Sequence, residues 1–242
     1  MAEKKAVNKV VEPTNEEIDA HVDQLVAKAQ VALSKFEEFT QEQVDYIVAK
    51  CSVAGLDAHG TLAEAAVNET GRGVFEDKAV KNLFACEYVT SNLRHLKTVG
   101  IINEDPLLGI TEIAEPVGVV CGIVPTTNPT STVIFKSLIC LKTRNPIIFS
   151  FHPSAHACSV MAAVVIRDAA IAAGAPEDCI QWLDLKSMYA TTALMKHPGV
   201  ATILATGGNA MVAAAYSCGK PALGVGAGNV PAYVEKTCVL PR

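Results

Sequence analysis

The stretch Val117–Lys136 holds the residues whose types and spacing best suit binding chemistry. It opens with an apolar, β-branched run to Val124, which predicts a strand buried on both faces. A polar loop, Pro-Thr-Thr-Asn-Pro-Thr, follows, and apolar residues then recur at helical spacing. A loop that leads from a buried strand into a helix presents unpaired backbone N–H groups and the positive end of the helix dipole. We therefore predict that a nucleotide pyrophosphate lies near Pro125–Thr130, with Asn128 as the N-cap of the helix.

Three further loops follow strand candidates, and ligands of open parallel sheets bind beyond the carboxyl ends of the strands. The loop 151–154 could face an adenosine ribose, although an ordinary turn with Ser154 as N-cap is equally compatible. The loop 205–209 has two adjacent glycines, which would let a ligand approach the backbone, whereas a plain glycine turn is the simpler alternative. The loop 224–229 fails as a dinucleotide fingerprint, because its third glycine comes one residue early and no helix is predicted after it. Four such loops at one sheet edge together predict a nucleotide site.

The eight cysteines are expected to be reduced thiols that mostly behave as small core residues. None forms a C-x-x-C pair, and several lie inside apolar runs, so a metal site or a disulfide framework is not expected. The first residues, MAEKKAVNK, have no apolar segment of the kind found in signal peptides. We therefore predict a cytoplasmic protein without a bound metal.

The composition excludes several classes of partner. Half of the 242 residues are hydrophobic and 19% are charged, which is enough to bury a substantial core. The net charge is −5 and no basic block occurs, so nucleic acid is not an expected partner. Three long uncharged stretches are interrupted by Pro, Gly, Asn or Thr, which argues against membrane spans.

The elements that must position these loops are predicted from periodicity. Residues 1–13 read as a flexible tail, and residues 14–109 as a helical layer packed on the sheet domain, with capping boxes at Thr14 and Thr40. Residues 110–116 alternate as a half-buried strand should. Further along the chain, strands and helices alternate, which predicts an α/β fold with a doubly wound, Rossmann-like parallel sheet over residues 110–242. The predicted strands are 117–124, 146–150, 180–183, 201–205 and 222–225, and the predicted helices are 129–142, 155–173, 187–196 and 210–217.

Several of these segments resemble a known family when they are taken together. The segments are ITEIAEPVGVVCGIVPTTNPTSTVIFKSL, LKTRNPIIFSFHP, ILATGG and GKPALGVGAGNVP, with FTQEQVD and ETGRGVFEDK in the helical part. They resemble the N-terminal acetylating aldehyde dehydrogenase part of the bifunctional aldehyde–alcohol dehydrogenases. The resemblance extends from about Asn15 to about Val234.

The resemblance implies an NAD-binding domain that works beside a domain with a cysteine nucleophile. The cysteine attacks acetyl-CoA, CoA leaves, and NADH reduces the thioester to acetaldehyde. Asn128 matches an asparagine that donates to the oxyanion, a role compatible with the N-cap role because an amide both accepts and donates. The resemblance also implies homo-oligomers or filaments for the full-length protein. The residues implied to contact NAD are Ile123, Val124, Pro125, Thr126, Thr127, Asn128, Gly208 and Gly226.

The nucleophilic cysteine of the family matches none of the eight cysteines and would lie beyond Arg242. We therefore expect a truncated chain that lacks the cysteine-bearing catalytic domain and the alcohol dehydrogenase domain, and that is inactive alone. Two alternatives stay open. One is a non-catalytic fragment that binds nucleotide or self-associates, and the other is a truncated monofunctional acylating aldehyde dehydrogenase.

Overall fold

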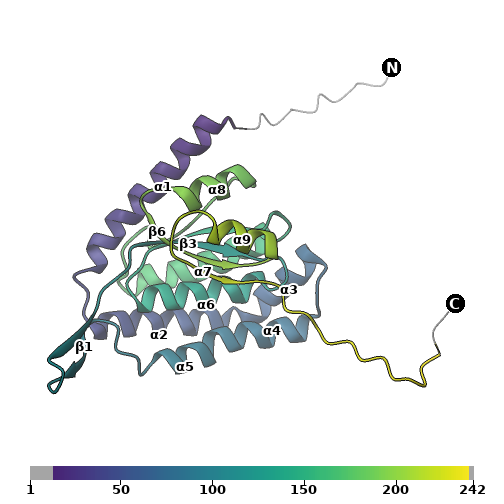
Figure 1. Ribbon diagram of the computed structural model, residues 1–242, viewed down its shortest axis with the longest axis horizontal. Helices are drawn as coiled ribbons and strands as arrows, with labels where there is room; N and C mark the ends of the chain where they lie inside the picture. Colours follow the sequence, from purple (N-terminus) through teal and green to yellow (C-terminus); the bar gives the residue numbers. More distant parts are fainter. Residues whose placement is uncertain (1–12, 240–242) are drawn as a thin grey trace.

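A computed structural model describes residues 13–239, and its central element is a five-stranded parallel sheet (Figure 1). The strands are β3 (Val119–Val124), β4 (Ile147–Phe151), β5 (Ile180–Trp182), β6 (Val200–Thr206) and β7 (Ala222–Val225), in the spatial order β5-β4-β3-β6-β7. All four pairings are parallel. β3 is central and buried along its whole length, as its β-branched run predicts. The predicted α/β fold with a parallel sheet is confirmed.

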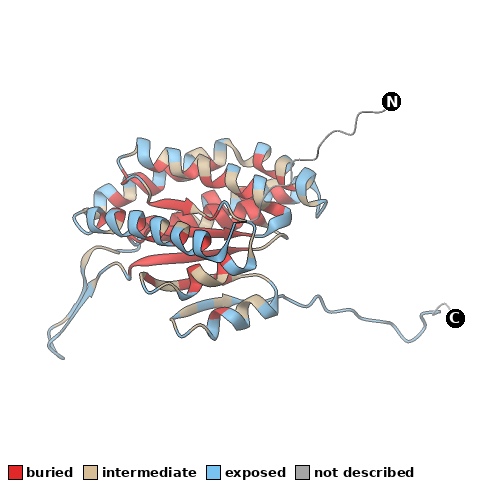
Figure 2. Ribbon diagram, turned by 90° about the horizontal axis from the view of Figure 1, so that it is seen from above, coloured by how far each residue is buried: buried red, intermediate tan, exposed pale blue. Residues whose placement is uncertain are grey.

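Helices cover both faces of this sheet. On one face lie α6 (Pro129–Lys142) and α7 (His156–Ala172), the latter preceded by a 3-10 turn (Pro153–Ala155). On the other face lie α1 (Asn15–Phe36), α8 (Met188–Lys196) and α9 (Asn209–Tyr216). Figure 2 shows the buried strands between these two layers of helices. Side chains alternate between the two cores along β3, since Val120 and Val124 join one and Val119 and Cys121 join the other.

A further helical layer lies outside α6 and α7. It consists of α2 (Gln41–Asp57), α3 (His59–Thr70), α4 (Phe75–Leu83) and α5 (Val89–Leu93), with a π-helical turn (Phe84–Tyr88) between α4 and α5 (Figure 1). The capping boxes predicted at Thr14 and Thr40 are both formed. The sequence predicts one helical layer for residues 14–109, whereas α1 packs on the sheet face opposite to α2–α5. The domain boundary at residue 110 stays a prediction.

A two-stranded antiparallel hairpin projects from this body (Figure 1). It consists of β1 (Gly100–Asp105), which the sequence analysis missed, and β2 (Ile110–Ala114), which it predicted. The prediction that this second strand is half-buried is wrong, because β2 is exposed at every position except Ala114. Ile110 and Ile113 are both exposed, and β1 is the only strand partner of β2 in the described part of the chain.

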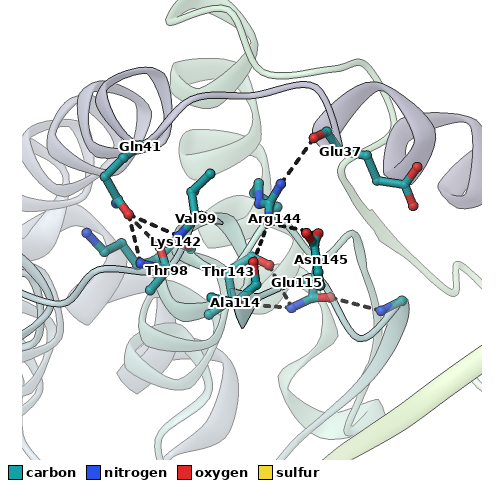
Figure 3. A network of polar contacts seen from close by, with 11 residues as sticks. Glu37, Gln41, Thr98, Val99, Ala114, Glu115, Lys142, Thr143, Arg144 and Asn145 are labelled. Atoms are coloured by element: carbon teal, nitrogen blue, oxygen red, sulfur yellow. Dashed lines mark hydrogen bonds and ion pairs between the residues drawn. The ribbon is translucent and has the colours of Figure 1, made fainter. Parts of the chain in front are cut away.

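A polar network anchors both ends of this hairpin to the end of α6 (Figure 3). Before β1, the main-chain N–H of Thr98 donates to Gln41 Oε1 at 2.7 Å, and the Thr98 hydroxyl donates to the carbonyl of Lys142 at 2.6 Å. After β2, Arg144 Nη2 donates to the carbonyl of Ala114 at 2.9 Å. Hydrogen bonds therefore hold the two ends of the exposed hairpin against the rest of the fold.

The stretch Pro153–Ala172, which comprises the 3-10 turn and α7, is long and apolar enough to cross a membrane by length and composition. In the fold it packs against α2, α3 and α6 and forms part of the core. Its apolar character is therefore explained by its position between the sheet and the outer helical layer. The predicted flexible tail, residues 1–13, lies outside the described residues except for Pro13.

Candidate nucleotide site

The carboxyl ends of β3, β4, β6 and β7 open onto one cavity of about 640 Å³. The strand order reverses between β3 and β6, and open parallel sheets bind ligands at such a reversal. All four predicted loops contribute to its lining. So do all eight predicted contact residues, namely Ile123, Val124, Pro125, Thr126, Thr127, Asn128, Gly208 and Gly226. The structure brings these residues together, and their contact with a nucleotide stays a prediction.

The loop after β3 offers unused hydrogen-bond donors at this cavity. Within residues 13–239, the main-chain N–H groups of Thr126, Thr127 and Asn128 have no backbone acceptor. The hydroxyl of Thr126 is also buried without a partner in the described part of the chain. Buried polar groups are seldom left unpaired, so the Thr126 hydroxyl points to a ligand, and the three N–H groups beside it are open to one. Their position before α6 is one where an anion is favoured.

Asn128 stands at the N-cap position of α6, but its side chain caps no backbone N–H. Its Oδ1 accepts instead from the hydroxyl of Thr127 at 2.7 Å. Its Nδ2 lies 3.4 Å from the hydroxyl of Thr132, which is a weak bond at best. The prediction that the side-chain amide caps the helix is therefore wrong. The side-chain Nδ2 of Asn128 makes only this weak contact at the cavity.

Glycines open the opposite wall. A Cβ at Gly207 or Gly208 would have no neighbouring atom within 4 Å, so no side chain covers the backbone on that side. Gly208 is also the N-cap residue of α9. Gly226 differs, because a Cβ there would come within 2.7 Å of Asn209 Oδ1 and would require that side chain to move. That same oxygen accepts from the N–H of Ala227 at 3.2 Å and so joins the last two loops.

The loop after β4 contributes His152 and Pro153 to the cavity. The alternative that Ser154 is an N-cap is wrong, because His152 is the capping residue and its Nδ1 accepts from the main-chain N–H of Ser154 at 3.2 Å. The helix amides of α7 are capped from outside, since Glu69 accepts from the N–H groups of Ala157 at 2.9 Å and Cys158 at 2.7 Å. Sequence periodicity contains no signal for a cap that comes from α3.

Lys136 is a residue near the site that the sequence analysis missed. Its Nζ donates to the carbonyl oxygens of Ile123 and Leu204, each at 2.6 Å. The side chain is buried, and burial lowers the pKa of its ammonium to about 7. The sequence carried one usable signal, because Lys136 falls on the same helical face as the apolar residues of α6.

The cysteines do not contribute to the cavity. All eight lie in the described range, none lines the cavity, and six are buried. Burial raises the pKa of these six thiols, to about 12 for Cys86, Cys121, Cys140, Cys158 and Cys179. A thiol with such a pKa is not a nucleophile at neutral pH. Within residues 13–239, no group of three or more His, Cys, Asp or Glu side chains could hold a metal ion.

The chain is similar in sequence and in structure to known proteins. The model of the aldehyde dehydrogenase family matches residues 3–235. Aldehyde-alcohol dehydrogenase 2 of Entamoeba histolytica is 73% identical over 223 residues, which are 91% of this chain and 26% of that protein. The crystal structure of an acetylating aldehyde dehydrogenase from Geobacillus thermoglucosidasius is similar with a TM-score of 0.88 and 48% identity, over 91% of this chain and 49% of that one.

A further similar structure is an engineered glycolyl-CoA reductase with bound NADP⁺, at a TM-score of 0.75 and 32% identity. The match covers 93% of this chain and 49% of that one. The chain spans about a quarter of the length of the curated aldehyde–alcohol dehydrogenases that it matches.

Proposed function

The chain belongs to the aldehyde dehydrogenase family, and from that premise we propose that it is the NAD-binding part of a CoA-acylating acetaldehyde dehydrogenase. The reaction of the whole protein is the reversible conversion of acetyl-CoA, NADH and a proton to acetaldehyde, CoA and NAD⁺. The relatives support this assignment, since they include aldehyde–alcohol dehydrogenases and an acetylating aldehyde dehydrogenase. The cytoplasm is the proposed location.

The observation that carries the proposal is the set of unpaired donors on the loop after β3. The main-chain N–H groups of Thr126, Thr127 and Asn128, with the buried hydroxyl of Thr126, fit the oxygens of an anionic nucleotide. Gly208, on the far side of the cavity, fits a ligand that lies against the backbone, and Gly226 lines the same wall. These residues would hold the dinucleotide, which supplies or accepts a hydride when it is bound.

Asn128 is proposed to act on the substrate rather than on the helix. Its Nδ2 is only weakly engaged by Thr132, so it is available to donate to an oxyanion that develops at a substrate carbonyl. The carbonyl itself must be held by a nucleophile that comes from elsewhere, because no cysteine of residues 13–239 lines the cavity. We therefore propose that the 242-residue chain alone binds nucleotide without turnover.

The cofactor and turnover can be tested separately. NADH and NADPH are titrated into the purified chain while the nicotinamide fluorescence is recorded. Saturable binding that is tighter for NADH is expected, and a lack of saturable binding for both nucleotides would contradict the proposal. Acetyl-CoA-dependent oxidation of NADH is then assayed with the same sample. Activity above background would show that the chain contains its own nucleophile, with Cys218 and Cys238 as the residues to replace first.

A second candidate function, self-association, is favoured by the projecting hairpin. Leu107 and Leu108 at its tip are 96% and 71% exposed, and Ile110 and Ile113 on β2 are also exposed. An isolated two-stranded hairpin is marginally stable in water, and such an apolar surface is typical of an interface. A second copy of the chain is the proposed partner, which agrees with the homo-oligomer or filament expected for the full-length protein.

A further inference from the structure

The outer helical layer contacts the Pro125–Asn128 loop through one buried lysine. Lys78 lies on α4 and is only 5% exposed, and its Nζ donates to the carbonyl oxygen of Thr127 at 2.8 Å. Its aliphatic part packs beside Gly73, where a Cβ would come within 3.4 Å of Lys78 Cε. Gly73 has a φ of +74°, which favours glycine. The backbone conformation therefore accounts for the glycine, and the turn before α4 lies beside the lysine side chain.

Asn82, one turn further along α4, contacts the chain on the other side of Asn128. Its Oδ1 accepts from the hydroxyl of Thr130 at 2.8 Å, and its Nδ2 donates to the carbonyl of His59 at 2.9 Å. The helix is thus hydrogen-bonded to Thr127 and to Thr130, the residues on either side of the Asn128-Pro129 step. Neither contact can be expected from local sequence patterns, because the partners are 49 and 48 residues apart.

The bond from Lys78 is a strong restraint for an electrostatic reason. Burial, with a smaller contribution from Lys81, lowers the pKa of Lys78. A buried ammonium group is unfavourable unless it is hydrogen-bonded, so its contact with the Thr127 carbonyl offsets part of that cost. Hydrogen bonds from charged donors are stronger than those from neutral ones. The Thr127 carbonyl is therefore held more firmly than a neutral donor would hold it.

The peptide plane transmits this restraint to Asn128. The Thr127 carbonyl and the Asn128 N–H belong to one trans peptide group, so they point in opposite directions. Because Lys78 holds the carbonyl on the side of α4, the Asn128 N–H points away from α4. Asn128 lines the cavity, and its N–H has no backbone acceptor in the described part of the chain.

We propose that Lys78 is a positioning residue of the nucleotide site, which fixes the Thr127–Asn128 peptide so that the Asn128 N–H stays available to the ligand. Asn82 assists by holding the first turn of α6 at Thr130. The inference rests on the proposed function and extends it, because it assigns a part of the site to a helix that does not line the cavity. Without the Lys78 ammonium, the peptide can rotate and its N–H loses its orientation.

The test compares three variants of the full chain in NADH titration. Lys78→Met removes the donor and is expected to weaken NADH binding by at least about tenfold. Lys78→Arg keeps a charged donor and should restore most of the affinity. Lys81→Met removes a charge from an exposed position on the same helix and should bind like the natural chain. Thermal unfolding of each variant is also recorded. The unfolding midpoint must lie well above the temperature of the titration, so that each variant is folded when NADH is added.

The outcomes distinguish a failure of the proposed function from a failure of the positioning role of Lys78. If the natural chain binds neither NADH nor NADPH, the proposed function fails. If the natural chain binds NADH and folded Lys78→Met binds it equally well, the positioning role is overturned while the site stands. If Lys78→Met does not fold, Lys78→Arg and Lys78→Gln decide. Affinity that is kept in the arginine variant and lost in the glutamine variant supports the role, and equal affinity in the two overturns it.

Discussion

The Nζ atom of Lys136 lies 2.6 Å from the main-chain carbonyl oxygen of Ile123, two residues before the loop that begins at Pro125. It makes a second bond of the same length to the carbonyl of Leu204. One side-chain nitrogen therefore links the carboxyl ends of β3 and β6 at the reversal of strand order. Below about pH 7, where this side chain is protonated, it also places a positive charge close to the cavity proposed for an anionic nucleotide.

Replacement of Lys136 by Met should change the pH dependence of stability. Burial lowers the pKa of Lys136 to about 7 in the folded chain, whereas the unfolded value is about 10.4. Between these values the unfolded chain binds more protons, so the free energy of unfolding of the natural chain rises with pH. Lys136→Met lacks this contribution, and all other titrating groups are shared by the two proteins.

The quantity to measure is the difference in the free energy of unfolding between the natural chain and Lys136→Met. It should grow in favour of the natural chain by up to about 1.4 kcal/mol per pH unit above roughly pH 7. Urea unfolding of both proteins at several pH values between neutrality and pH 9 measures it. A difference that does not change with pH would mean that Lys136 has an ordinary pKa.

Replacement of Gly208 by Val should block nucleotide binding with little loss of stability. A Cβ at this position meets no atom within 4 Å, so the valine clashes with nothing in the protein but extends from a residue that lines the cavity. We expect NADH binding to weaken by at least about tenfold, and a stability loss of about 1 kcal/mol or less, since Val is a poorer N-cap than Gly. Gly60→Ala, on α3 away from the cavity, is the control. Unchanged NADH affinity in Gly208→Val would argue against the proposed site.

The parts of the fold that follow from local chemistry were predictable. The β-branched run before Pro125 predicts β3, and the predicted bounds of α6, residues 129–142, agree with the structure because Pro129 begins the helix. The convergence of four loops also followed from sequence alone, since parallel strands place their carboxyl ends at one edge. The family resemblance is confirmed by the aldehyde–alcohol dehydrogenases that match over most of the chain.

The parts that depend on distant contacts were not predictable. Lys78 is an ordinary surface residue by its helical pattern, and only the fold shows that its ammonium reaches Thr127. Asn128 was expected to cap α6, but the hydroxyl of Thr127 occupies its acceptor oxygen. β1 was missed because, within the described residues, it pairs only with β2 and has no buried face. Its sequence therefore shows no alternation of apolar and polar residues.

Replacement of Asn128 by Ala should leave stability almost unchanged. The side chain makes no N-cap bond, and its two contacts are with the hydroxyls of Thr127 and Thr132. We expect a change of about 0.5 kcal/mol or less in the free energy of unfolding. Ser187→Ala is the matched comparison, because the Ser187 hydroxyl accepts from the N–H groups at the start of α8 and its loss should cost about 1 kcal/mol. Urea unfolding of both variants decides, and a loss in Asn128→Ala as large as that in Ser187→Ala would restore the capping role.

Charged residues at the tip of the hairpin should disrupt the proposed self-association. Leu107→Glu combined with Leu108→Glu removes the two most exposed apolar side chains of the tip. The turn itself should persist, because it is held by main-chain N–H groups of both residues that donate to Asp105 Oδ1 at 2.9 and 3.0 Å. Sedimentation equilibrium should then show a shift toward the monomer, since carboxylates are costly to bury in an interface.

Val53→Glu is the control for this prediction. It places one charge on the outer face of α2, where the valine is 56% exposed, and should leave the association state unchanged. A double variant that associates as strongly as the natural chain would exclude the hairpin as the contact, and equal loss in Val53→Glu would assign the effect to net charge instead.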